Sequence, residues 1–227
     1  ILRAVDDLGE VARAAGGGGT LRLGVIPTIA PYLLPRVLPA LRGRFGEMDI
    51  AVRETLTPTL LAALQEGRID VALLALPVEN AGLTAMPLFD EALLVVRPPG
   101  ASGPVDAAAL AQDTLLLLEE GHCFRDHALA VCGTGRAAAL DGSSLSTLVQ
   151  MVGAGLGVTL IPEIAAPVER RAAPVVVSRL AGTAPVRQVG LVWRRASPLA
   201  AHYREIGEVV LSAAREVLDA SADVGEL

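Results

Sequence analysis

Residues 21–26 read Leu-Arg-Leu-Gly-Val-Ile, a short apolar run that leads into a turn with prolines at positions 27 and 31. A run of this length and composition is typical of a buried β-strand. The elements expected next are a helix with Leu34, Val37, Leu38 and Leu41 on one face, a strand over 49–54, a helix over 59–65 and a strand over 71–74. This alternation predicts a βαβαβ unit with a parallel sheet and right-handed crossovers.

A second set of elements follows another strand, expected over residues 88–97, which ends at Pro98-Pro99-Gly100 and marks a hinge. The pattern predicts helices over 106–111, 145–152, 162–166 and 198–218, and strands over 114–118, 157–161, 175–180 and 186–193. The final helix carries an apolar stripe at a helical period. These elements indicate a second α/β subdomain.

The reactive side chains are concentrated in residues 121–132, Gly-His-Cys-Phe-Arg-Asp-His-Ala-Leu-Ala-Val-Cys, which hold both cysteines and two of the three histidines. The run predicts a short helix that begins near Cys123. Nine residues of helix would place the cysteines on opposite faces, with their Cα atoms about 13 Å apart. A disulfide needs Cα atoms within about 7 Å. If the helix forms, the two thiols cannot be bonded within it.

Two interpretations of these cysteines remain open from the residues alone. Both can be buried thiols that pack as small apolar groups. Alternatively, oxidation joins them by unwinding the segment, which would make a redox switch. The position of Cys123 near a helix start favours a reactive thiolate there, with Arg125 within reach.

Composition excludes several classes of protein. The 227 residues carry a net charge of −6 without a basic cluster, so we expect this polypeptide alone to bind DNA poorly. No apolar run approaches a membrane span and no signal peptide is evident. Two cysteines do not form a disulfide scaffold, which favours a cytoplasmic setting.

The chain begins with Ile1 rather than Met, and we expect a fragment that lacks an N-terminal part. Apolar residues recur at a heptad spacing at Ile1, Val5, Leu8, Ala12 and Ala15, and a tetraglycine follows at 16–19. This pattern predicts the end of a dimerising helix and a flexible linker. A helix packed on its own domain is the alternative.

The motif Gly121-His122-Cys123-x-Arg125-Asp126-x-Ala128, closed by Cys132, resembles the redox centre of OxyR, the peroxide-sensing branch of the LysR-type transcription regulators. The resemblance continues at residues 24–28, 31–35, 87–91, 151–155, 190–194 and 197–199. Phe124 stands where that family usually has leucine, and His127 where glutamine is common.

The resemblance implies an α/β fold of two Rossmann-like subdomains with periplasmic-binding-protein-like (type 2) architecture, joined by a two-strand hinge. It places the tail of a linker helix and a Gly-rich linker at 1–20. Subdomain I would combine 21–96 with 196–227, and subdomain II would comprise 97–195 and carry the cysteines.

The resemblance also implies roles for individual residues. Cys123 would react with peroxide, and Cys132 would resolve the product. The residues matched to the peroxide pocket are Thr28, Thr57, His122 and Arg125, and those matched to positions behind it are Asp126 and Arg194. Structural alternatives are a helix N-cap for Thr28, with the same ambiguity for Thr57, a surface ion pair of Arg125 with Asp126, and a solvated strand-end charge for Arg194.

The implied function is that of a hydrogen-peroxide-sensing and oligomerisation domain of a LysR-type transcription factor, switched by a Cys123–Cys132 disulfide. It needs no cofactor or metal and is not an enzyme. The implied partners are a second copy in a homodimer or homotetramer, a reductant such as glutaredoxin or thioredoxin, and promoter DNA with RNA polymerase through the full-length protein. The alternatives are an effector-binding or solute-binding domain of the same fold, and a thiol peroxidase. A metal site at His122, Cys123, His127 and Cys132 fits no usual zinc spacing.

Overall fold

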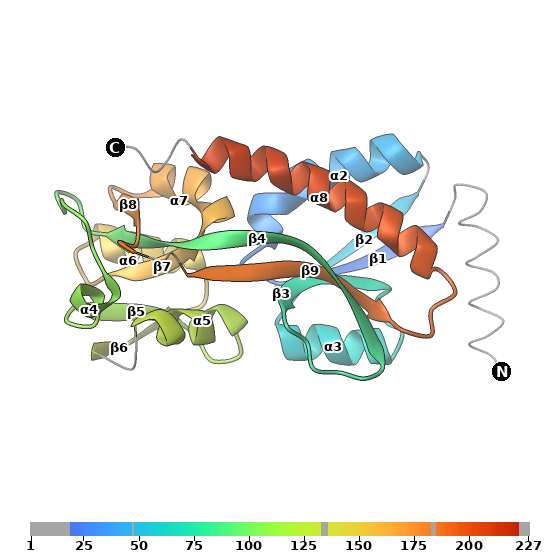
Figure 1. Ribbon diagram of the computed structural model, residues 1–227, viewed down its shortest axis with the longest axis horizontal. Helices are drawn as coiled ribbons and strands as arrows, with labels where there is room; N and C mark the ends of the chain where they lie inside the picture. The colour runs from blue at the N-terminus through green and yellow to red at the C-terminus, as the bar shows by residue number, and fades with distance from the viewer. Residues whose placement is uncertain (1–18, 47, 133–135, 183–184, 223–227) are drawn as a thin grey trace. The chain divides into compact units, whose positions relative to one another are not determined.

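The computed structural model describes residues 19–46, 48–132, 136–182 and 185–222 (Figure 1). The chain forms two compact units. The first comprises Ile1–Phe89 with Gln188–Glu216, and the second Asp90–Arg187 with Val217–Leu227. The expected dimerising helix and most of its glycine linker fall on residues 1–18, which lie outside the described residues.

The first unit contains the predicted βαβαβ succession. Its elements are β1 (Thr20–Val25), α2 (Ala30–Phe45), β2 (Asp49–Glu54), α3 (Thr57–Gln65) and β3 (Val71–Leu76). Strand β1 lies between β2 and β3 and pairs with both in parallel, which confirms the expected parallel sheet. Strand β9 (Val186–Arg194) adds to β3 in antiparallel register, from Val71 opposite Trp193 to Leu76 opposite Gln188.

Helix α2 accommodates two internal prolines, Pro35 and Pro39. Together with Pro31 they are spaced by four residues and all are exposed, so the carbonyl groups left without a helical donor lie on the solvent side. The buried face carries Leu33, Val37 and Leu41, and the residues at 34 and 38 are only half-buried. The apolar face is therefore rotated from the one that the sequence predicted.

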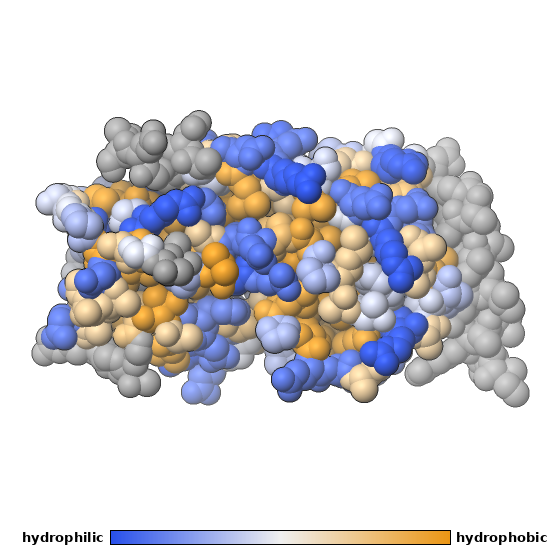
Figure 2. Space-filling model, in the orientation of Figure 1, coloured by the Kyte–Doolittle hydropathy of each residue, from blue (hydrophilic) through white to orange (hydrophobic). Residues whose placement is uncertain are grey.

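Helix α8 (Ala200–Ala222) carries the predicted apolar stripe. Tyr203, Ile206, Val210 and Ala213 are buried, and the ring of Tyr203 meets that of Trp193 edge-on at 6.0 Å between centroids. On the face shown in Figure 2, hydrophilic side chains are interspersed with apolar ones, as expected where amphipathic elements turn their polar sides outward. In the described residues, no helix combines the length and apolar character that crossing a bilayer demands.

The second unit is built around strand β4 (Leu83–Arg97), which pairs in antiparallel register with β7 (Thr159–Pro162) and β8 (Val176–Arg179). Its other elements are α4 (Ala107–Leu110), β5 (Thr114–Leu118), α5 (Cys123–Cys132), β6 (Arg136–Gly142), α6 (Leu145–Gly153), the 3-10 turn η1 (Glu163–Ala165) and α7 (Ala166–Ala172). Strand β6 was not predicted from the sequence and pairs in parallel with β5.

Two strands connect the units. Strand β4 begins in the first unit and ends in the second, whereas β9 begins at Val186 in the second and ends in the first. This arrangement confirms the predicted fold class of two α/β subdomains joined by a two-strand hinge.

Candidate functional site

Both cysteines lie on one short helix, as the sequence predicted. Cys123 is the first residue of α5 and Cys132 the last, and both are free thiols. Helix α5 buries Phe124, Ala128 and Cys132, which recur every four residues and therefore share one face. Helical geometry keeps the two cysteine Cα atoms about 13 Å apart, so a bond between them requires the helix to unwind.

The two thiols have different surroundings. Cys123 is half-buried, whereas Cys132 is only 5% exposed. Burial raises the pKa of the Cys132 thiol to about 11. At neutral pH Cys132 is therefore a protonated thiol, which is a weak nucleophile while α5 stays folded.

The two histidines of the segment are half-buried at the start of α5 and one turn later. Burial lowers the pKa of His122, and the nearby Glu119 carboxylate opposes that effect. Burial also lowers the pKa of His127, whose Nδ1 lies 2.9 Å from the carbonyl oxygen of Cys123. Since a carbonyl can only accept, Nδ1 carries the proton and donates. Both imidazoles thus favour the neutral form.

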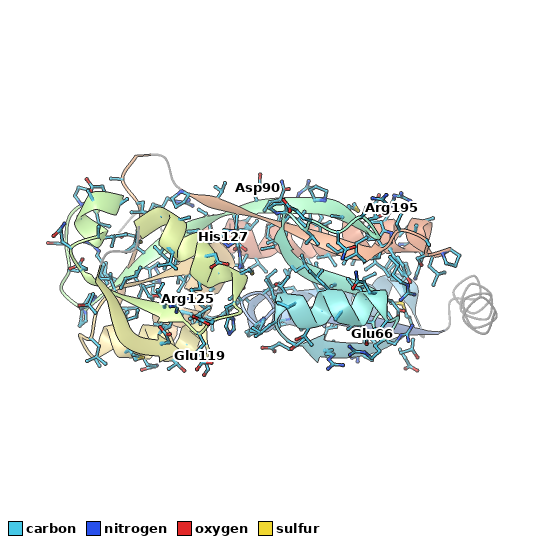
Figure 3. All side chains as sticks on the ribbon, turned by 90° about the horizontal axis from the view of Figure 1, so that it is seen from below. Glu66, Asp90, Glu119, Arg125, His127 and Arg195 are labelled. Carbon is cyan, nitrogen blue, oxygen red and sulfur yellow. The ribbon has the colours of Figure 1, made fainter. Side chains whose placement is uncertain are left out.

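Arg125 ties the start of α5 to the neighbouring strands. Its Nη1 donates to the carbonyl oxygen of Leu118 at 2.7 Å and to Oδ1 of Asp141 at 3.1 Å. Arg125 and His127 both project from α5 in Figure 3. The ion pair of Arg125 is therefore with Asp141 at the end of β6, not with Asp126, which is exposed.

A fully buried ion pair lies behind α5 and was missed by the sequence reasoning. Arg187 Nε lies 2.7 Å from Oε1 of Glu91, and Oε2 of Glu91 accepts the backbone N–H of Ile164 at 3.2 Å. The Arg187 guanidinium also lies 5.2 Å from the centre of the Phe124 ring. Burial raises the pKa of Glu91, while the charge of Arg187 acts to lower it.

A signal for Arg187 was present in the sequence. In a strand, alternate residues face the same side, and Arg187 shares its parity with the apolar residues Val189 and Leu191. The alternation places its side chain on the buried face, where a charge needs a partner. Glu91 supplies that partner from β4.

The two threonines lie in the first unit, next to the carboxyl ends of β1 and β2. Thr28 is buried in the turn before α2, and the N-cap of α2 is Ile29, so Thr28 does not hold the capping position. Thr57 is the first residue of α3. Its Oγ1 is buried without a hydrogen-bond partner among the described residues.

Arg194 also belongs to the first unit. Its Nη1 donates to the carbonyl oxygen of Leu64, near the end of α3, at 3.0 Å. The guanidinium covers Gly67, where a Cβ atom would lie 3.0 Å from Nη1. Arg194 therefore satisfies the carbonyl end of α3 and is not simply a solvated charge at the end of a strand.

No group of three or more His, Cys, Asp and Glu side chains in the described parts of the chain is arranged to hold a metal ion.

The model of the LysR substrate binding domain family matches residues 14–215. Among curated relatives, a probable hydrogen peroxide-inducible genes activator of Mycobacterium leprae is 43% identical, over 91% of this chain and 71% of the relative. The DNA-binding transcriptional dual regulator OxyR of Escherichia coli K12 is 39% identical, over 92% of this chain and 72% of its own.

Solved structures of OxyR proteins are similar to this chain as well. A cysteine-to-serine mutant of Corynebacterium glutamicum OxyR with bound hydrogen peroxide matches with a TM-score of 0.88 and 32% identity, covering 97% of this chain and 74% of that one. A reduced form of OxyR from Neisseria meningitidis matches with a TM-score of 0.79 and 30% identity, covering 86% and 95%.

Proposed function

Since this chain belongs to the LysR substrate binding domain family, as an OxyR-type regulatory domain that senses peroxide, we propose that its sensing step is a reversible disulfide between Cys123 and Cys132. The observation that carries the proposal is their placement at the two ends of one ten-residue helix. A bond between them cannot form without changing that helix, so the covalent event becomes a change of conformation.

The chemistry has two steps. The Cys123 thiolate attacks one oxygen of hydrogen peroxide, the O–O bond breaks, and hydroxide leaves while Cys123 becomes a sulfenic acid. The Cys132 sulfur then attacks the sulfenic sulfur, the S–S bond forms, and the oxygen leaves as water. A cellular dithiol such as thioredoxin, or a glutaredoxin, would return both thiols by exchange.

The burial of Cys132 orders these steps. Because its pKa is about 11, Cys132 is a poor nucleophile in the folded helix, and Cys123 is the thiol positioned to react first. We assign Cys132 to the second step, after the segment begins to open and its thiol reaches water.

The groups proposed to stabilise the leaving hydroxide are Thr28, Thr57 and His122. Thr57 has the clearest support, because its buried hydroxyl has no hydrogen-bond partner among the described residues. Neutral His122 can donate a proton or a hydrogen bond. We propose that Arg125 acts on the same site by holding the start of α5. We propose that Asp126 and Arg194 act indirectly, through the residues that surround the peroxide.

The energetics permit a reversible switch. Unwinding α5 removes about six helical hydrogen bonds at roughly 1 kcal/mol each, together with the burial of Phe124 and Ala128. A two-electron thiol couple supplies about 1.4 kcal/mol for each 30 mV of potential difference. A potential difference of a few hundred millivolts is therefore sufficient to offset the loss.

Regulation by this domain would act through its assembly. We infer that it works as a homodimer or homotetramer and that the full-length protein acts on promoter DNA together with RNA polymerase. DNA binding and transcriptional regulation are what the name of the Escherichia coli relative states for that protein. The altered segment 123–132 would change how the copies meet.

The direct test is mass-spectrometric mapping of the thiols before and after one equivalent of hydrogen peroxide. We expect an intramolecular Cys123–Cys132 bond, a trappable sulfenic acid on Cys123 in Cys132→Ser, and slow peroxide consumption in Cys123→Ser. Hydrogen exchange of the oxidised protein should show lost protection across 123–132. A confirmed disulfide with unchanged protection there would contradict the switch.

A further inference from the structure

We propose that Phe124 is a positioning residue that sets how readily the Cys123–Cys132 pair is oxidised, because the buried Arg187 guanidinium lies over its ring only while α5 is helical. This inference rests on the proposed disulfide. It assigns to Phe124 a role in the equilibrium of the switch and not in the attack on peroxide.

The contact is a cation–π pair in a dry environment. The central carbon of the Arg187 guanidinium lies 5.2 Å from the centre of the Phe124 ring. Phe124 is 2% exposed and Arg187 is 1% exposed. A cation within about 6 Å of a ring centre is attracted by the negative face of the ring, and the attraction is stronger when water is excluded.

The cation is anchored by contacts outside the redox helix. Arg187 Nε bonds Glu91 at 2.7 Å, and Glu91 is fixed in turn by the backbone N–H of Ile164 at 3.2 Å. These anchors belong to β9, β4 and η1, none of which contains a cysteine. These bonds hold the guanidinium from elements other than α5, whereas the position of the Phe124 ring depends on α5.

Phe124 follows Cys123 directly in the chain, so a change of the backbone conformation at Cys123 displaces the Phe124 ring. Closing the disulfide requires the backbone of 123–132 to leave its helical path, since the helix holds the two Cα atoms about 13 Å apart. The contact with Arg187 is then present in the dithiol state and lost in the disulfide state. A contact made in one state only shifts the equilibrium toward that state.

The first test is Phe124→Leu, which keeps an apolar side chain and removes the aromatic face. The disulfide fraction is measured by differential alkylation and mass spectrometry across a series of glutathione redox buffers. We expect the equilibrium constant for disulfide formation to rise about tenfold, which corresponds to a midpoint about 30 mV more negative. An unchanged or less negative midpoint would overturn the proposal.

The matched control is Phe45→Leu. Phe45 also lies near an arginine, with the Arg44 guanidinium 5.3 Å from its ring centre, but it sits at the end of α2 in the first unit. The midpoint of the cysteine pair should be the same in this variant as in the parent protein. An equal shift in both variants would show a general effect of losing an aromatic ring, and would overturn the assignment to Phe124.

A loss of packing at position 124 would shift the midpoint in the same direction, so the effect of the cation must be isolated. Phe124→Leu is therefore repeated in the background Glu91→Gln with Arg187→Gln, which removes both charges together. We expect the shift caused by Phe124→Leu to fall below about twofold in that background. A shift of equal size in both backgrounds would mean that the ring acts only by filling space.

The same question can be answered without removing the ion pair, should the charge-free background not fold. Phenylalanines with increasing numbers of ring fluorines, incorporated at position 124, weaken the negative face at nearly constant shape. The equilibrium constant for disulfide formation should rise steadily with the number of fluorines. A flat series would overturn the proposal.

The Cys123–Cys132 disulfide and the role of Phe124 can be refuted separately. Absence of a Cys123–Cys132 bond in the parent protein at every potential would refute the proposed function and this inference with it. A disulfide that forms normally but responds neither to Phe124→Leu nor to fluorination would refute the inference alone.

Discussion

The Nδ1 atom of His127 lies 2.9 Å from the carbonyl oxygen of Cys123, one helical turn earlier on α5. The bond exists only in the helical conformation, because residues four apart lie above one another only there. The side chain of His127 thus adds a second local contact to the backbone bonds that hold the reactive cysteine in place.

Acid should weaken this part of the protein through His127. Burial is the main cause that lowers its pKa from the ordinary value of 6.5; Arg187 acts in the same direction, and the backbone bond to Cys123 and the charge of Asp126 oppose it. Between 6.5 and the lowered value the unfolded segment binds more protons than the folded one. Stability is therefore fully present above pH 6.5 and is lost as the pH falls through that window.

We expect hydrogen-exchange protection of α5 to fall between pH 7.5 and 5.5 in the parent protein, after correction for the intrinsic rates, and to fall less in His127→Gln. His202→Gln is the control, because burial also lowers the pKa of His202 but that residue lies on α8 in the first unit. Equal pH dependence in His127→Gln and the parent would show that another group carries the effect.

The burial of Cys132 predicts slow alkylation of that thiol. In Cys123→Ser the only thiol is Cys132, and with its pKa raised from 9.0 to about 11, the thiolate fraction at pH 8 falls about a hundredfold below that of an ordinary cysteine. The rate of iodoacetamide modification should be lower by about this factor or more, and should rise steeply up to pH 11. Urea should restore the ordinary rate. Rapid modification of the native variant at pH 8 would contradict the ordering of the two chemical steps.

The contacts of Arg125 predict where the start of α5 is held. Arg125→Ala removes the bond to the Leu118 carbonyl and the ion pair with Asp141, and should cost about 1–2 kcal/mol in the local stability of α5. Asp141→Asn should cost less than about 1 kcal/mol, because the Asp141 side chain is 39% exposed. Hydrogen exchange measures both.

A double-mutant cycle identifies the partner of Arg125. The effect of Arg125→Ala on the local stability of α5 should be non-additive with that of Asp141→Asn and additive with that of Asp126→Asn. Coupling to Asp126 in place of Asp141 would mean that the surface ion pair between neighbours, the alternative from sequence, forms in solution.

Much of the fold was predictable because its signals are local. Strands β1 and β3 are short apolar runs, and the helices between them carry apolar residues at a helical period. Strand β6 was missed because Arg136-Ala137-Ala138-Ala139 has low strand propensity; it forms by pairing with β5, which is a tertiary effect.

In the candidate site, too, the local features were predictable and the long-range contacts were not. Helix α5 and its two cysteines were singled out from the residues themselves, and the resemblance assigned the cysteines their roles. The partners of its side chains come from elsewhere: Asp141 follows Arg125 by 16 residues, and Arg187 follows Glu91 by 96. A single sequence gives no spacing rule for pairs set by strand register, so Arg187 could be placed on a buried face but not next to Phe124.

Thr57 offers a test that separates a functional role from a structural one. Its Oγ1 is buried, and within the described residues it has no hydrogen-bond partner. A desolvated hydroxyl without a partner costs about 1–3 kcal/mol of stability. The presence of the Thr57 hydroxyl would be explained if it donates to a ligand that is not always present. Valine has nearly the same shape and lacks the hydroxyl.

We therefore expect Thr57→Val to leave the free energy of unfolding unchanged or to raise it by about 1 kcal/mol. In the Cys132→Ser background, the same substitution should slow sulfenic acid formation on Cys123 by about 100- to 1,000-fold, as the loss of one donor to a developing oxyanion does. Thr59→Val is the matched control, since Thr59 is exposed on the same helix and should alter neither quantity. If Thr57→Val instead costs more than about 1 kcal/mol of stability and leaves the rate unchanged, the hydroxyl has a structural partner and the peroxide pocket must be built from other donors.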